Sequence, residues 1–221
     1  MSPMRGLSRV LIGVLAIDAA MFGLAIVLDA TEIGALERST TGSARPGEMA
    51  SIVARQESFA GGFFLILVAT TVIWMIWQFR GQRNLLRARR AGVRFTPGCA
   101  VGWWFIPIVN LWKPFQSVRE LWMRSDPSDR ASHGWWVIGM WWAAFLVANV
   151  LFSTDAEAPT AEAVIATRKA TIVGAATGIA ATLFAIWIVR GVAQRQEAIE
   201  PWVPSRPDLP PAWPALPSPP G

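Results

Sequence analysis

Four blocks of about 20 apolar residues most constrain what this chain can fold into. A helix of that length crosses the ~30 Å hydrocarbon core of a bilayer, and core helices of soluble proteins seldom run uncharged for so long. Charged residues make up 16% of the 221 residues, against roughly 25% in a soluble domain. We therefore predict an all-α integral membrane bundle of four transmembrane helices, at residues 7–28, 59–79, 134–152 and 170–189.

The distribution of Lys and Arg predicts how these spans are threaded. With four spans, the N-terminal segment, the connection at 80–133 and the C-terminal segment share one side of the membrane. They hold 15 of the 20 Lys and Arg residues. Because positively charged connections stay in the cytoplasm, we expect both termini there and the protein in the cytoplasmic (inner) membrane of a bacterium.

A Trp-rich segment at about 95–124 lies between the second and third spans. Its apolar run is short for a span, Pro107 would interrupt a helix, and a fifth span would abolish the charge bias. We predict an interfacial or re-entrant element on the cytoplasmic side, and the sequence leaves these two alternatives open. Pro114 is placed to open an amphipathic helix within it.

Five arginines at spacings of three and four residues precede this element. They form one cationic stripe if the helix of the second span continues through them, and Trp side chains favour the headgroup level of a membrane. The candidate contacts for lipid headgroups or a protein partner are Arg80, Arg83, Arg87, Arg90, Arg94, Trp103, Trp104, Trp112 and Trp122. A solvated stop signal without a specific ligand is the alternative interpretation of the arginines.

The run FTPGCAVGWWFIPIVNLWKPFQSVRELW, residues 95–122, carries a recognisable signature. It resembles a bacterial, mostly actinobacterial, membrane family catalogued as domain of unknown function 4328. The shared features are the Pro-Gly break, W-W-F-I-P, N-L-W-K-P, R-E-L-W and the upstream pair Arg83-Asn84. The resemblance covers about 59–142, and the first and last spans fit by layout. It implies a multi-span membrane fold and supplies no activity.

Asp18 lies in the middle of the first span. A carboxylate there is costly and is expected to face the bundle interior. Its candidate partners at similar depth are Thr70, Thr71, Thr177, Thr182 and the indoles of Trp141 and Trp142. The favoured interpretation is a protonated Asp18 that hydrogen-bonds a threonine between helices. The alternative is a proton or cation path, although a path usually shows several ionisable residues.

The fourth span contains the run GAATG, in which Gly174 and Gly178 form a GxxxG pattern. Small residues at this spacing let two helices approach closely. We expect packing within the bundle, with a homodimer seam as the less favoured use.

Catalytic motifs are missing from the sequence. One Cys and one His leave little material for a disulfide, a zinc site or a His-based triad. No phosphate-binding loop or nucleophile elbow is present. We therefore expect a non-enzymatic protein without a cofactor or metal. We also expect no nucleic-acid partner, because the positive charge follows the sides of the membrane.

The predicted organisation is a membrane domain at 1–196 and a proline-rich cytoplasmic tail at 197–221 that is extended and suited to docking a protein partner. The leading functional hypothesis is a membrane scaffold or interaction protein that uses the basic, Trp-rich surface. The alternative is a small proton- or cation-coupled transporter or channel component with Asp18 in its path.

Overall fold

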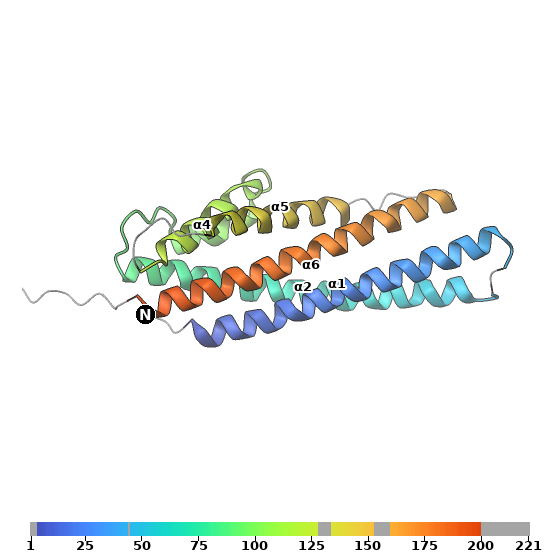
Figure 1. The fold of residues 1–221 in the computed structure, drawn as a ribbon, viewed down its shortest axis with the longest axis horizontal. Coiled ribbons are helices and arrows are strands. Elements are labelled where there is room, and N and C mark those ends of the chain that lie inside the picture. Colours follow the sequence, from blue (N-terminus) through green and yellow to red (C-terminus); the bar gives the residue numbers. More distant parts are fainter. Residues whose placement is uncertain (1–3, 44, 128–133, 153–159, 200–221) are drawn as a thin grey trace, which may run out of the picture.

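The computed structural model of the protein describes residues 4–43, 45–127, 134–152 and 160–199. The proline-rich stretch at 201–221 lies outside the described residues. The elements are α1 (Arg5–Thr40), α2 (Glu48–Arg87), α3 (Pro97–Gly102), the 3-10 helices η1 (Trp103–Phe105) and η2 (Val109–Leu111), α4 (Lys113–Arg124), α5 (Trp135–Phe152) and α6 (Ala161–Glu197) (Figure 1). The part of the chain that is described contains no β-strand.

Four helices, α1, α2, α5 and α6, are long and apolar enough to cross a membrane. This confirms the predicted all-α fold with four membrane-compatible helices. Three of them run well beyond the predicted spans, with 36 residues in α1, 40 in α2 and 37 in α6. The connection expected between the first two spans is therefore mostly helical, and positions 41–47 alone separate α1 from α2.

The four long helices form an open arrangement. Helix α6 contacts both α1 and α5, and α1 also contacts α2. Within the described residues, the backbones of α2 and α5 do not approach each other closely, although the Trp74 and Trp141 rings stack between them at 5.3 Å. The element α3–α4 connects them instead, because α3 contacts α2 and α4 contacts α5. The Trp-rich element thus closes one end of the gap between α2 and α5.

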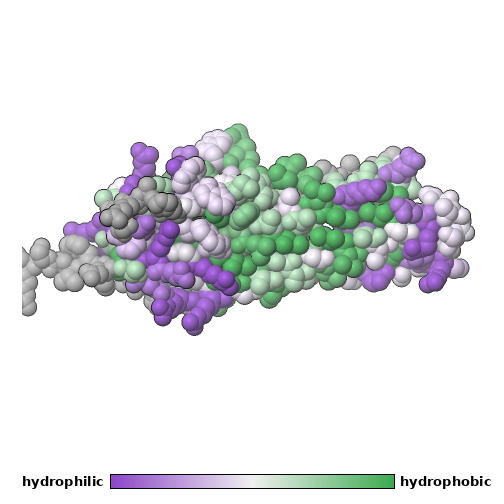
Figure 2. All heavy atoms as spheres, viewed as in Figure 1, coloured by the Kyte–Doolittle hydropathy of each residue, from purple (hydrophilic) through white to green (hydrophobic). Residues whose placement is uncertain are grey.

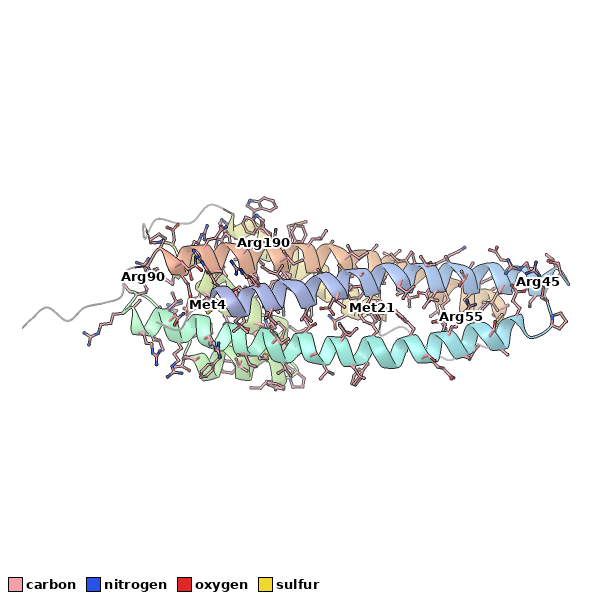
Figure 3. All side chains as sticks on the ribbon, turned by 90° about the horizontal axis from the view of Figure 1, so that it is seen from below. Met4, Met21, Arg45, Arg55, Arg90 and Arg190 are labelled. Atoms are coloured by element: carbon pink, nitrogen blue, oxygen red, sulfur yellow. The ribbon has the colours of Figure 1, made fainter. Side chains whose placement is uncertain are left out.

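The two ends of the bundle are polar and its middle is apolar (Figure 2). We call the end that holds Met4, Arg90 and Arg190 the N-terminal end, and the end that holds Arg45 and Arg55 the far end (Figure 3). This distribution is the one expected of a protein whose middle lies in hydrocarbon and whose ends lie in water.

One face of α1 is buried along its whole length. The buried residues recur at separations of three, four or seven positions, which keep side chains on one side of a helix. They are Ser8, Leu11, Leu15, Asp18, Ala25, Asp29, Glu32 and Ala35. Because this face carries polar residues as well as apolar ones, the inside of the bundle receives polar groups at several depths.

The predicted five-arginine stripe on one helix is wrong in its second half. Helix α2 ends at Arg87, so Arg90 and Arg94 lie beyond it. The backbone reverses through Arg89, with φ 51°, and Gly92, with φ 73°. The left-handed region favours glycine, and a Cβ on Gly92 would lie 2.5 Å from Nη2 of Arg124. Only Arg80, Arg83 and Arg87 share the helix.

Candidate functional site

The Trp-rich element is a hairpin of helices beside the bundle. Its first helix, α3, starts where the Thr96 hydroxyl accepts a hydrogen bond from the Cys99 amide at 3.2 Å, an N-cap followed by proline. Its second helix, α4, runs antiparallel to α5. Trp142 Nε1 donates to the Leu111 carbonyl at 2.9 Å, whereas Arg119 lies over the Trp135 ring, 5.1 Å from its centroid. The hairpin tip therefore lies about two turns along α5.

Gln78 fixes α3 and α4 to α2. Its side chain is fully buried. Nε2 donates to the Ser117 hydroxyl at 2.8 Å and to the Ala100 carbonyl at 3.2 Å. Oε1 accepts from Trp104 Nε1 at 3.0 Å. A single amide thus satisfies groups from three segments of the element, and such networks fix one arrangement when every member has a partner.

Glu120 holds the entry of the hairpin. Its carboxylate accepts from the backbone amides of Arg94 at 2.8 Å and Phe95 at 3.0 Å. It also accepts from Gln82 Nε2 at 3.2 Å. The glutamate of the R-E-L-W motif is therefore a capping group for the chain that leads into α3.

Gln196 of α6 joins the same end. Its Nε2 donates to the Gly81 carbonyl at 3.0 Å and to the Ser125 hydroxyl at 3.2 Å. Its Oε1 accepts from Asn84 Nδ2 at 3.1 Å. Asn84 belongs to the Arg-Asn pair of the signature, so this part of the motif also holds α2, α4 and α6 together.

Trp122 corrects a prediction, because it is 2% exposed and cannot contact headgroups. Its ring stacks on Trp187 with centroids 4.5 Å apart, and the Arg195 guanidinium lies 3.7 Å from the ring centroid. A Cβ on Gly191 would lie 2.3 Å from the ring, so glycine makes room for it. Burial lowers the pKa of the Arg195 guanidinium. The apolar ring belongs inside because α4, α5 and α6 meet around it.

The remaining predicted contacts divide between surface and interior. Arg80, Arg83, Arg87, Arg94 and Trp112 are exposed, and Trp103 is half-buried. Arg90 donates to the carbonyl oxygens of Arg124 and Asp126. The Trp104 ring meets Trp142 and Phe145 edge-on.

The tip of the hairpin has an apolar surface, of which the sequence analysis singled out only Trp112. Phe105 is 73% exposed and Ile108 is 72% exposed. Ile106, Leu111 and Trp112 are also exposed. We call these five residues the apolar tip.

Asp18 lines a cavity of about 610 Å³ between α1, α2, α5 and α6. Its side chain is 3% exposed. Thr70, Thr71 and Thr182 line the same cavity. The hydroxyls of Thr71 and Thr182 donate to carbonyls of their own helices, as does that of Thr177, which does not line it.

Three buried polar groups of this cavity lack hydrogen-bond partners among the described residues. The Thr70 hydroxyl is the polar neighbour of the Asp18 carboxyl, although neither Asp18 Oδ1 nor Thr70 Oγ1 makes a hydrogen bond of standard geometry with a described residue. Trp74 Nε1, which is buried in the same lining, also makes no hydrogen bond with a described residue. Trp142, a predicted partner of Asp18, donates to Leu111 instead.

Sequence reasoning missed a second polar cluster, at the far end of the cavity. Glu32 lies 2.9 Å from Arg168 Nε and accepts from Gln56 Nε2 at 2.5 Å. Asp29 accepts from the Thr171 hydroxyl at 2.8 Å. The sequence signal for this cluster was the spacing of the buried α1 residues, which continues past the predicted span to Asp29 and Glu32.

The glycines of the fourth span pack inside the bundle. A Cβ on Gly174 would lie 3.1 Å from Leu151, and one on Gly178 would lie 2.8 Å from the Phe22 ring. The GxxxG pattern thus faces α5 and α1 of the same chain.

The family model described as Domain of unknown function (DUF4328) matches residues 41–194. This range takes in the W-W-F-I-P and R-E-L-W motifs, the gap between α2 and α5, and most of α6. No match is found among curated proteins or among solved structures.

Proposed function

We propose a function for this chain, which belongs to the DUF4328 family. The description of that family assigns no activity. Its four membrane-compatible helices make it a membrane protein. We propose that it is a non-enzymatic scaffold or interaction protein of the cytoplasmic membrane with both termini in the cytoplasm. Its N-terminal end would contact anionic lipid headgroups.

The supporting observation is the order of groups along the bundle axis. The apolar tip lies level with Trp142 and Phe145, well inside α5, through the contacts of Leu111 and Trp104. The exposed Arg80, Arg83 and Arg87 lie beyond Gln78, toward the N-terminal end. This order favours a re-entrant hairpin over a flat one: the tip reaches acyl chains while the arginines stand at the headgroups, each contributing about 1 kcal/mol.

The surface is held rigidly. Gln78, Glu120 and Gln196 tie the hairpin to α2 and α6 through buried and half-buried hydrogen bonds. Little conformational freedom is then lost when a ligand or partner binds, which raises affinity for a given contact area. The proline-rich tail would supply a second contact for a protein partner.

Lipid selectivity tests the proposal. The protein is purified from membranes of known composition, and retained phosphatidylglycerol and phosphatidylcholine are measured by mass spectrometry. Wild type should enrich the anionic lipid at low salt and lose it as ionic strength rises. A variant with Arg80, Arg83 and Arg87 changed to Gln should lose the enrichment.

A matched control removes three positive charges at the far end, by changing Arg45, Arg55 and Lys169 to Gln. All three are exposed. This variant should keep the enrichment. Equal loss in both variants would show a general charge effect, and no loss in either would contradict the headgroup role.

Threading is tested by labelling introduced cysteines in a Cys99→Ser background, since Cys99 is an exposed free thiol. An impermeant maleimide should reach Ser51→Cys in intact cells. It should reach Gln194→Cys only after permeabilisation. The reverse pattern would overturn the orientation.

Coupled transport of protons or cations is the second candidate, favoured by the position of Asp18 in the cavity. On α2, the described cavity lining ends at Met75. Closer to the N-terminal end, Trp77, Leu85 and Leu121 are fully buried. A path would have to open through this packed end. Proton flux into liposomes that is lost in Asp18→Asn would favour transport.

A further inference from the structure

We propose that the cavity between α2 and α5 binds an organic cation with an apolar body, its positive charge placed beside Asp18. This site is separate from the N-terminal surface discussed above. It does not depend on the scaffold proposal.

The lining supplies aromatic faces on both sides of the carboxylate. Phe22, one turn along α1 from Asp18, contacts the rings of Phe63 at 5.0 Å and Phe152 at 5.8 Å. Trp74, one turn along α2 from Thr70, stacks on Trp141 at 5.3 Å. Aromatic faces attract cations, most strongly where water is excluded. The rings also supply the contact area for an apolar body.

The charges of the lining favour a cation over a neutral guest. Among the described residues, the charged ones that line the cavity are Asp18, Asp29 and Arg168. Asp29 is engaged by Thr171, and Arg168 lies against Glu32, both at the far end. Asp18 Oδ1 has no partner among the described residues. A buried carboxylate is costly unless it is paired or neutralised, and a bound cation would pair it.

Entry is from the side. Phe64 is 64% exposed and lines the cavity from α2, and Thr71 and Asn149 are exposed lining residues of α2 and α5. They flank the gap between the α2 and α5 backbones, on the far-end side of the stacked Trp74 and Trp141 rings. A ligand dissolved among lipid chains therefore reaches Asp18 without crossing either end. The volume of about 610 Å³ falls within the roughly 300–1,000 Å³ of small-molecule pockets.

The test compares two probes of one shape. The first is trimethyl(4-phenylbutyl)ammonium, and the second is the neutral hydrocarbon in which carbon replaces the nitrogen. Binding to the full chain in zwitterionic nanodiscs is measured by equilibrium dialysis against empty nanodiscs. Wild type should bind the cation at least about tenfold more tightly than the isostere, equivalent to about 1.4 kcal/mol. Equal affinity would overturn the proposal.

Two pairs of variants locate the site. Asp18→Asn should lose about tenfold in affinity for the cation and keep its affinity for the isostere, whereas Asp29→Asn should bind both as wild type does. Thr71→Trp fills the mouth of the cavity and should lose both probes. Val72→Trp should retain them, because Val72 is exposed on the same turn and is not part of the lining.

Unchanged cation binding by Asp18→Asn, or loss in Asp29→Asn alone, would overturn the assignment. If Asp18→Asn does not fold, as judged by circular dichroism, the pair at 71 and 72 decides. Wild-type binding by a folded Thr71→Trp would then overturn the proposal.

Discussion

The Gln78 and Gln196 amides at the N-terminal end and the Asp18 carboxyl in the middle of the bundle differ in how they are bonded, although the N-terminal end also holds buried atoms without partners among the described residues, such as Trp122 Nε1 and Gln82 Oε1. At the N-terminal end, the amides of Gln78 and Gln196 join α2, α4 and α6 by hydrogen bonds between 2.8 and 3.2 Å. In the middle, Asp18 and Thr70 face a cavity with polar atoms that lack partners among the described residues. Partnered amides contribute about 0.5–1.5 kcal/mol each, whereas an unpartnered buried group costs about 1–3 kcal/mol.

This difference distinguishes the polar groups that hold the fold together from those that can bind a ligand. Three groups of the family signature make contacts within the chain: Asn84, Glu120 and Trp122. They explain how the hairpin is held. The groups that are free to meet a ligand lie outside these inward contacts, at Asp18, the apolar tip and the arginines of α2.

The comparison is most strongly tested by Gly191→Ala. The new Cβ would lie 2.3 Å from the Trp122 ring, which is held between Trp187 and Arg195 and has no room to move. We expect a loss of about 3 kcal/mol, the upper range for overpacking. The measurement is the free energy of unfolding in a mixed-micelle denaturant titration.

Gly139→Ala is the matched control, since a Cβ added to Gly139 on α5 would meet no atom within 4 Å. This substitution should leave the free energy of unfolding within about 1 kcal/mol of wild type, with any change favourable because alanine is the better helix former. Equal losses in the two variants would contradict a specific role for the Trp122 stack.

Gln78→Leu should have the next largest effect, about 2 kcal/mol, because the Trp104 indole and the Ser117 hydroxyl lose their shared partner. Hydrogen exchange should increase in 97–112 more than in α1. Gln194→Leu, at an exposed position of α6, serves as the control. Uniform exchange across the protein would show that Gln78 does not hold the hairpin in particular.

Asp18→Asn should have the smallest effect on stability, under about 1 kcal/mol in either direction. The reason is that Asp18 Oδ1 makes no hydrogen bond within the described chain that the substitution would remove. The same denaturant titration measures it. A loss as large as that of Gln78→Leu would mean that Asp18 holds the helices together, as the hydrogen-bond interpretation of the sequence requires.

The positions of the helices could be predicted from local patterns in the sequence. Apolar length located all four membrane-compatible helices. Pro114 marked the beginning of α4, where it occupies the first turn. Both signals act within one helix, so they do not depend on which helices become neighbours.

The candidate sites were harder to predict because they join distant residues. Asp29 and Glu32 contact Gln56, Arg168 and Thr171, which lie on other helices. No spacing in the sequence predicts these pairs. Trp122 was assigned to the surface from composition, whereas its burial depends on Gly191 and Trp187 of α6. The reversal of the chain at Arg89 and Gly92 likewise shortened the arginine stripe.

The length of α2 has a mechanical consequence. Its 40 residues extend about 60 Å at 1.5 Å per residue, roughly twice the thickness of the hydrocarbon core. One uninterrupted rod therefore joins the turn at the far end to Arg80, Arg83 and Arg87. Because the last turns of α2 are bonded to the hairpin and to α6, a push along the helix axis at that turn would be transmitted to the N-terminal end without any helix unfolding.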